Sequence, residues 1–219
     1  MNRGVRVALV ALGAIAAGAL IAFYLVAYLL VKPPTTSAAS SGAGTASLTL
    51  QTVAAFGSGE SPDWVSYLIR DPQGNWQHTT NFQLPANSLV KVTLYQYDTP
   101  TGLRNPFYTQ VRGTVGNVMS LNGKSTQTID QADAAHTFAI PDLGVSVPLR
   151  GVDATAKNQC TAAPCDTSMA HNTVTFSFRT GAPGTYRWQC FVPCGAGNLY
   201  GNGGPMQTLG YMSGFLYVV

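Results

Sequence analysis

Two cysteines stand close together near the end of the chain, Cys190 and Cys194, and Met212 opens the last apolar stretch. Upstream, His136 begins another apolar stretch. Thiolate and thioether are soft ligands that select copper over magnesium or calcium, and imidazole also suits copper. The grouping therefore favours a copper site, for which His136 is the candidate imidazole.

The same two cysteines have a second interpretation. Two cysteine sulfurs that converge on one point can hold a shared metal or form a disulfide nearly equally well. Cysteines of exported domains are also more often bridges than ligands. A copper site and a structural or redox disulfide both stay open for Cys190 and Cys194.

A further pair of cysteines, Cys160 and Cys165, lies in a polar loop in which Pro164 and Asp166 favour a turn. We expect this pair to form a local disulfide, because the loop that it closes is short and polar. Free thiols and a second metal site are the alternatives.

The stretches around His136 and the cysteine pair together resemble the water-exposed domain of cytochrome c oxidase subunit II. That family places a histidine ahead of Pro-x-Leu-Gly, then Cys-x3-Cys-Gly, and a methionine in a Met-x-Gly strand. The resemblance covers roughly Asp133 to Val219. It implies a cupredoxin fold and assigns His136, Cys190, Cys194 and Met212 as copper ligands.

One ligand of the family's dinuclear copper A centre fails to match. The family has a second histidine four residues after the second cysteine, where this chain has Asn198, and the position three before Met212 is Leu209. No histidine follows His171. Since an amide oxygen is a harder and weaker donor to copper than imidazole, we expect one copper ion at most.

Two further residues are alternative metal ligands. Met206 offers a second thioether, although a methionine in a loop more often fills an apolar gap. His171 precedes a strand and could approach a loop site in three dimensions, but nothing in its spacing requires that. Neither has the sequence context that distinguishes His136.

Enzymatic chemistry by this chain is not indicated. The sequence shows no Ser-His-Asp arrangement, no paired catalytic carboxylates, no HExxH and no phosphate loop, and Glu60 is its one glutamate. General acid–base catalysis needs such groups. At most, we expect a non-catalytic electron-transfer subunit of a heme-copper oxidase.

The elements that would position these ligands are short strands. Apolar or alternating runs separated by turn residues continue to the C-terminus, with no convincing long amphipathic helix. The alternation is clearest from Val90 to Tyr97, and Asp71-Pro-Gln-Gly74 and Asp98-Thr-Pro-Thr-Gly102 are turn signals. We predict an all-β, cupredoxin-like antiparallel β-sandwich of the Greek-key type behind one N-terminal transmembrane helix.

The start of the chain has the features of a membrane anchor. From Val7 to Val31 there are 25 consecutive uncharged residues, enough for a helix of about 37 Å. Arg3 and Arg6 precede this run, which by the positive-inside rule places the N-terminus in the cytoplasm. A cleaved signal peptide is the alternative, but its apolar region would be shorter. Either way, the domain is exported.

Three segments follow from this pattern. Residues 1–32 are the expected anchor in the cell membrane, residues 33–46 a flexible linker rich in Ser, Thr, Gly and Ala, and residues 47–219 the extracytoplasmic domain. The net charge of +3 comes from the first segment, since the nine basic and nine acidic residues of the third balance. A basic footprint for nucleic acid is therefore lacking.

The sequence thus predicts a membrane-anchored extracytoplasmic cupredoxin with an electron-transfer or accessory role. Its expected partners are the membrane and respiratory oxidase subunits or a redox protein. Copper delivery is the alternative that uses the same residues, because Cys-x3-Cys with one distant histidine also resembles the ligand set of the Sco-type copper metallochaperones. A metal-free structural subunit with a Cys190–Cys194 disulfide is the third possibility.

Overall fold

The computed structural model describes residues 2–30, 34–40, 42, 44–54, 63–195 and 204–219. They divide into two compact units, Met1–Lys32 and Pro33–Val219. The first unit is helix α1 (Arg3–Tyr24) continued by a π-helical segment, η1 (Leu25–Leu29). By length and composition this helix could cross a membrane, and an N-terminal signal sequence would have the same features.

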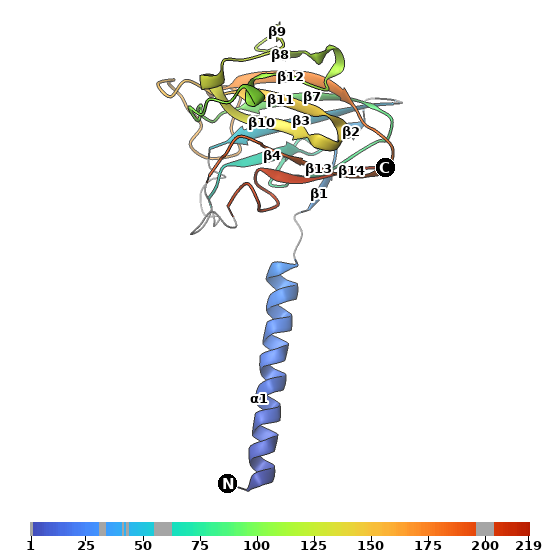
Figure 1. Ribbon diagram of the computed structural model, residues 1–219, viewed down its shortest axis with the longest axis vertical. Helices are drawn as coiled ribbons and strands as arrows, with labels where there is room; N and C mark the ends of the chain where they lie inside the picture. The colour runs from blue at the N-terminus through green and yellow to red at the C-terminus, as the bar shows by residue number, and fades with distance from the viewer. Residues whose placement is uncertain (1, 31–33, 41, 43, 55–62, 196–203) are drawn as a thin grey trace. The chain divides into compact units, whose positions relative to one another are not determined.

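The second unit is built from strands joined by turns and short 3-10 helices (Figure 1). The strands are β1 (Thr35–Ser37), β2 (Ala39–Ser40), β3 (Thr45–Val53), β4 (Ser66–Arg70), β5 (Trp76–Gln77), β6 (Asn81–Leu84), β7 (Leu89–Gln96), β8 (Met119–Leu121), β9 (Lys124–Thr126), β10 (Ala134–Ile140), β11 (Val145–Arg150), β12 (Asn172–Arg179), β13 (Gly184–Gln189) and β14 (Ser213–Val218). The 3-10 helices are η2 (Pro106–Thr109), η3 (Val115–Asn117), η4 (Gln131–Asp133) and η5 (Pro141–Leu143).

These strands form two sheets that pack face to face. One has the order β1-β6-β14-β13-β10-β11, and the other has the order β5-β4-β3-β7-β12-β8-β9 with β2 paired to β3. A single buried cluster joins them, since Leu50 of β3 and Phe176 of β12 share it with Phe138 of β10 and Trp188 of β13. The predicted β-sandwich behind one long apolar N-terminal helix is therefore confirmed.

Alternation of apolar and polar residues produces this core. In β7, Val90, Val92 and Leu94 are buried, whereas Lys91 between them is exposed. Successive side chains of a strand point to opposite faces, so this period of two gives the sheet one apolar face. The alternation seen in the sequence from Val90 onward thus matches the burial of this strand.

The sheets are mixed rather than purely antiparallel, which differs from the sequence prediction. Strand β3 runs parallel to β7, and β6 runs parallel to both β14 and β1. Parallel neighbours cannot be joined by a tight hairpin, so these pairings unite strands that are distant in the chain. Alternation within a strand carries no information about the direction of its neighbour.

Part of the segment that the sequence predicts to be a linker is paired with the sandwich. Strand β1 pairs with β6, β2 pairs with β3, and β3 already begins at Thr45. Thr36 is buried and Ala46 belongs to the core. Backbone hydrogen bonds to neighbouring strands hold these residues in place. Because every residue type except proline can make such bonds, a composition rich in Ser, Thr and Ala does not predict this pairing.

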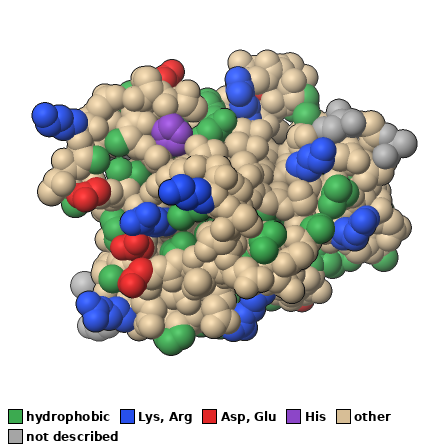
Figure 2. Space-filling model, turned by 90° about the horizontal axis from the view of Figure 1, so that it is seen from above, with side chains coloured by type: hydrophobic (Ala, Val, Ile, Leu, Met, Phe, Trp, Pro, Cys, Tyr) green, Lys and Arg blue, Asp and Glu red, His purple; other side chains and the backbone are tan. Residues whose placement is uncertain are grey.

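The charged side chains of the face seen in Figure 2 are scattered. Lys and Arg side chains are spread across this face among uncharged and hydrophobic groups, and some lie close to Asp or Glu side chains. A protein that binds nucleic acid through its backbone phosphates usually gathers basic residues into one patch or stripe. This face carries no such patch.

Candidate metal centre

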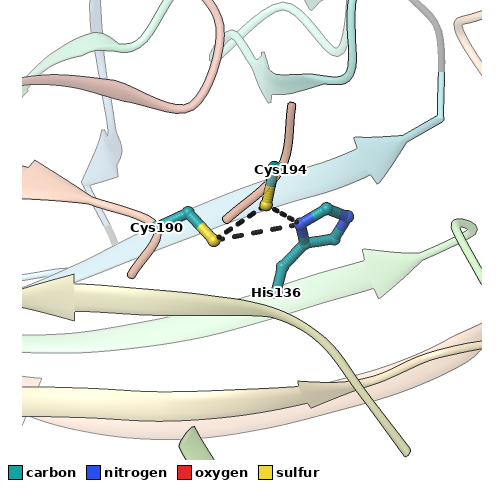
Figure 3. A group of neighbouring side chains, drawn as sticks. All are labelled: His136, Cys190 and Cys194. Atoms are coloured by element: carbon teal, nitrogen blue, oxygen red, sulfur yellow. Dashed lines mark hydrogen bonds between the residues drawn. The ribbon is translucent and has the colours of Figure 1, made fainter. Parts of the chain in front are cut away.

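Two strands of the same sheet bring the cysteines to the histidine. His136 lies near the start of β10, Cys190 directly follows the end of β13, and the two strands pair at Ala139 and Gln189. Cys194 returns to the same point at the end of a short loop. Figure 3 shows both sulfurs and the imidazole ring pointing toward one another.

Three donor atoms converge at this point. His136 Nδ1 is 2.9 Å from Cys194 Sγ and 3.9 Å from Cys190 Sγ, and the two sulfurs are 3.3 Å apart. Within the part of the chain that the structure describes, this is the group of His, Cys, Asp and Glu side chains arranged closely enough to hold a metal ion. The structure thus brings together three of the four predicted ligands through their donor atoms.

Backbone hydrogen bonds hold the cysteine loop against β10. Thr137 N donates to Cys190 Sγ at 3.3 Å, and Phe191 N donates to Thr137 Oγ1 at 2.8 Å. Both thiols face the carbonyl of Val192, at 3.4 Å from Cys190 Sγ and 2.9 Å from Cys194 Sγ. Because the contacts of Thr137 tie the loop to the strand that carries His136, sulfurs and imidazole are positioned together.

Asp98 completes the site, and sequence reasoning missed it. Its Oδ2 is 3.0 Å from His136 Nε2, the ring nitrogen that points away from the sulfurs. Its carbonyl accepts hydrogen bonds from Val152 N at 2.9 Å and Gln96 Nε2 at 3.0 Å, which fix the turn after β7. In neutral imidazole, a proton held at Nε2 by this carboxylate leaves the Nδ1 lone pair facing both sulfurs.

Burial and pairing set the charge of the imidazole. His136 is 1% exposed, and burial by itself lowers its pKa. Hydrogen bonds to Asp98 and Cys190, with the charges of these groups, outweigh burial and raise the pKa of His136 to about 9. Burial likewise raises the pKa of Asp98, but its bond to His136 brings that pKa below the ordinary value. Without metal, the pair is therefore charged near neutral pH.

The pKa values of the two cysteines shift in opposite directions. Burial raises the pKa of Cys190, but hydrogen bonds to Cys194 and His136 lower it well below the ordinary value. The pKa of Cys194 is raised, first because it donates to Cys190 and then because it is itself buried. These opposite shifts favour the thiolate at Cys190 over a thiolate at Cys194.

Aromatic side chains pack against the site on the side that faces the core. Tyr67 is fully buried and its hydroxyl donates to Thr137 O at 2.9 Å. Burial, then the charges of Cys190 and Cys194, raise the pKa of Tyr67, so it stays a neutral phenol. Its ring lies 5.0 Å from that of Trp188. On this inner side Cys190 is fully buried and shielded from water.

On its outer side the site opens into a cleft of about 590 Å³. Its lining residues include His136, Cys194, Asp98, Trp64 and Pro205. Cys190 is fully buried and lies outside that lining. One of the two sulfurs is therefore reachable by a small solute while the other is not.

Met212 is placed beside Cys190 through the backbone. Cys190 N donates to Met212 O at 2.9 Å, and Met212 N donates to Pro205 O at 3.1 Å. The Met212 side chain is fully buried in the core. Met206 is half-buried and packs against the same core, which is the gap-filling role expected for a loop methionine.

The other residues weighed from the sequence lie elsewhere. His171 Nδ1 is 2.7 Å from Met169 O and its ring contacts Tyr95 and Tyr97, so it does not join the site among the described residues. Leu209 is half-buried and bridges to Ser213. Asn198 lies outside the described residues.

Cys160 and Cys165 are joined by a disulfide with a Cα–Cα distance of 5.8 Å. Cys165 packs on the outer face of the second sheet with Val53, Leu68 and Tyr97. Its backbone N–H donates to Gln51 Oε1 at 2.7 Å. The disulfide closes a short loop, and its two sulfurs lie outside the group formed by His136, Cys190 and Cys194.

No protein-family model matches the sequence, and no curated protein matches it significantly. Solved structures that match include rusticyanin from Thiobacillus ferrooxidans, at 14% identity and TM-score 0.37 over 86% of this chain and 84% of that one. Another is the metal-binding domain of the Cu(I)-exporting P-type ATPase CopA of Streptococcus pneumoniae, at 10% identity and TM-score 0.35 over 86% of this chain and 99% of that one.

A heme-copper terminal oxidase dimer also matches, at 13% identity and TM-score 0.33 over 99% of this chain and 97% of that one. Every one of these TM-scores is below 0.5, so the likenesses say nothing about what this chain does. Its chemistry has to be inferred from the site itself.

Proposed function

We propose that this chain is a membrane-anchored, extracytoplasmic copper protein of the cupredoxin type that transfers single electrons in or beside a respiratory oxidase. One observation carries the proposal. Two cysteine sulfurs and one imidazole nitrogen lie within 3.9 Å of one another, and a carboxylate orients the imidazole from behind.

The donor set fits a copper ion. Two soft sulfurs and a borderline nitrogen favour copper, and also zinc, over the oxygen-seeking cations. Asp98 supplies the outer-shell carboxylate that metal-bound histidines commonly use. The apolar wall around Cys190 favours Cu(I), which needs no further ligand from water. When bound, copper would supply a one-electron carrier.

Each residue of the site has a defined role in this proposal. Cys190 and Cys194 would hold the ion as thiolates, and His136 would bind it through Nδ1. Asp98 keeps a proton at His136 Nε2, so that Nδ1 stays directed at the sulfurs. Met212 stands at the position that the subunit II resemblance assigns to a weak axial ligand.

One copper ion per chain is the expected stoichiometry. A dinuclear centre of the subunit II type requires a second imidazole, and the described residues place His171 with Tyr95 and Tyr97 instead. Two thiolates and one imidazole are sufficient for a single three-coordinate Cu(I) ion. Mononuclear copper is therefore favoured over the dinuclear form.

Copper delivery is the second candidate function, and one observation favours it. Cys194 and His136 line an open cleft, and a metal that must be handed to a partner needs such an exposed ligand. A metal-free structural role requires a Cys190–Cys194 disulfide, and sulfurs 3.3 Å apart can form one upon oxidation. Stoichiometry and exchange rate separate these alternatives.

Anchoring by α1 and export of the sandwich complete the proposal. Support comes from the length and apolar composition of the helix, and from Arg3 and Arg6 at its start. Protease protection in oriented membranes tests it, since the sandwich should be cleaved only from the extracytoplasmic side. Oxidase subunits or a redox protein are the proposed partners.

An anaerobic Cu(I) titration of the reduced full chain in non-ionic detergent tests the copper site. We expect one tightly bound copper per chain, lost in His136→Ala and retained in His171→Ala, which serves as the matched control. Retention of copper by the reduced protein against a strong Cu(I) chelator favours electron transfer, whereas rapid transfer to it favours delivery. Failure to bind copper when reduced would overturn both.

A further inference from the structure

The cysteine loop also reaches the surface through a pair of aromatic rings that copper binding does not use. Phe191 lies between the two cysteines, is half-buried, and is fixed to β10 by its hydrogen bond to Thr137. Its ring centroid is 5.9 Å from that of Phe107, edge to face at 84°. Phe107 is 43% exposed. These two rings form a continuous path from Cys190 to solvent.

An arginine lies over the outer ring. Arg112 Cζ is 5.4 Å from the Phe107 ring centroid, within the range of a cation–π interaction. The backbone of Arg112 pairs with Ser146 in both directions, at 2.8 and 2.9 Å. Next to it, Gly113 has φ +69° and approaches Gly144 so closely that a Cβ would lie 2.4 Å from its carbonyl oxygen. The fold therefore fixes the backbone of Arg112, and its side chain extends from there over the Phe107 ring.

The charge of Arg112 has no acidic partner in the described part of the chain. The ion pairs there are Asp98 with His136 and Arg150 with Asp133. Arg112 Nη2 donates instead to the neutral Gln110 Oε1 at 2.9 Å. A guanidinium has five donors in a planar fork that matches a carboxylate. Its remaining donors are available to an acidic group of another molecule.

This surface is separate from the cleft over the metal centre. The cleft is lined by residues that include the carboxylates Asp63 and Asp98, whereas Phe107, Phe191 and Arg112 are absent from its lining. The cleft gives a small solute access to Cys194, and the aromatic surface gives a macromolecule access to the segment bonded to Cys190. The cleft thus carries carboxylates and admits small solutes, whereas the aromatic surface carries a guanidinium and can contact a macromolecule.

We propose that Phe107, Phe191 and Arg112 form the docking surface for a one-electron carrier protein whose contact face presents carboxylates around an apolar centre. The inference rests on the proposed copper site. Apolar rings exclude water from the contact and the arginine selects an acidic partner. One electron passes between carrier and site in either direction, and no bond forms or breaks. Tunnelling weakens steeply with distance, so contact next to a ligand residue favours transfer.

A copper-independent experiment tests the docking surface. Amide signals of the reduced, copper-free full chain in non-ionic detergent are recorded with paramagnetic hexacyanochromate(III), an anion, and with hexaamminechromium(III), a cation. We expect the anion alone to broaden Phe107, Arg112 and Phe191. Arg112→Gln should abolish that broadening, whereas Arg179→Gln, which removes the same charge at the exposed end of β12, should leave it. Equal broadening by both ions, or survival in Arg112→Gln, would overturn the proposal.

A kinetic experiment tests transfer itself. The Cu(I)-loaded chain is oxidised in a stopped-flow instrument by ferricyanide and by the cationic tris(phenanthroline)cobalt(III). Arg112→Gln should slow the ferricyanide reaction several-fold while leaving the cobalt reaction unslowed, and Phe107→Ala should slow both. Variants that behave like Arg179→Gln contradict the docking surface while leaving the copper site intact. A chain that loads no copper instead refutes the proposed function, and with it the electron-transfer part of this inference.

Discussion

The molecule holds two closely spaced cysteine pairs in contrasting environments. Cys160 and Cys165 are bonded to each other, and Cys165 packs among apolar side chains. Cys190 and Cys194 are free thiols whose sulfurs lie 3.3 Å apart and face an imidazole. Sequence spacing is nearly the same in both pairs, so spacing does not decide their chemistry.

What differs is the set of groups around the sulfurs. Cys190 Sγ accepts the Thr137 N–H and lies 3.9 Å from His136 Nδ1, and both groups stabilise a thiolate. Cys165 instead packs with the side chains of Val53, Leu68 and Tyr97, and its sulfur is bonded to that of Cys160. A thiolate beside an imidazole can bind a metal ion, whereas Cys160 and Cys165 form a crosslink. The predictions below test that distinction in order of expected effect.

The largest effect should follow from removing one free thiol. Cys190→Ser or Cys194→Ser should weaken Cu(I) binding by more than about 100-fold, because loss of a direct ligand exceeds the effect of losing an outer-shell partner. The double variant Cys160→Ala with Cys165→Ala should bind Cu(I) as the parent chain does. Competition with a Cu(I) chelator measures both, and equal losses in the two pairs would contradict the distinction.

Removing the carboxylate behind the imidazole should have the next largest effect. In Asp98→Asn, His136 Nε2 loses its charged partner, and we expect copper affinity to fall by about 10- to 100-fold. Asp142→Asn, a change at an exposed carboxylate in η5, is the matched control. The same chelator competition measures them. An affinity that stays unchanged in Asp98→Asn would show that the carboxylate does not orient the ring.

Removing the Cys160–Cys165 disulfide should lower the thermal stability of the protein without changing its affinity for copper. Closure of so short a loop contributes about 2 kcal/mol in the chain-entropy model, so the double variant of Cys160 and Cys165 to alanine should fold and melt at a lower temperature. Calorimetry of the copper-free chain checks this. Reactivity of either cysteine with a thiol reagent in the native, unreduced protein would contradict the disulfide.

The smallest effect concerns the titration of the imidazole. In the reduced, copper-free chain His136 should stay protonated until the pH approaches 9, since its pKa is raised to about 9. The stability that it contributes is complete below the unfolded pKa of about 6.5 and is lost as the pH rises through 9, while the lowered pKa of Cys190 contributes in the opposite sense. Asp98→Asn should lower the midpoint of the His136 titration by about 1 to 3 pH units, which NMR of the imidazole ring measures.

Much of the candidate metal centre was predictable because its motif is local. Cys190 and Cys194 share one loop, and His136 stands in a recognisable stretch at the start of a strand. Asp98 was not predictable, because β7 and β10 belong to different sheets and the turn after β7 meets β10 only in the folded sandwich. Its position beside Thr99 and Pro100 indicated a turn and nothing more.

The fold shows the same division between local and distant information. Alternation in β7 predicted its buried face, and the turn residues predicted where strands end. The parallel pairing of β3 with β7, and the pairing of β1 with β6, depend on contacts between distant segments. The contact between Phe107 and Phe191 joins residues of η2 and the cysteine loop in the same way.

X-ray absorption at the copper edge tests the central claim most directly. The full chain in non-ionic detergent is reduced and loaded with Cu(I) without oxygen, and the spectrum reports the atoms bound to copper. We predict one copper per chain with two sulfur ligands and one nitrogen ligand, and loss of the nitrogen in His136→Ala. Two coppers with scattering between them, or copper bound without sulfur, would contradict the proposed site.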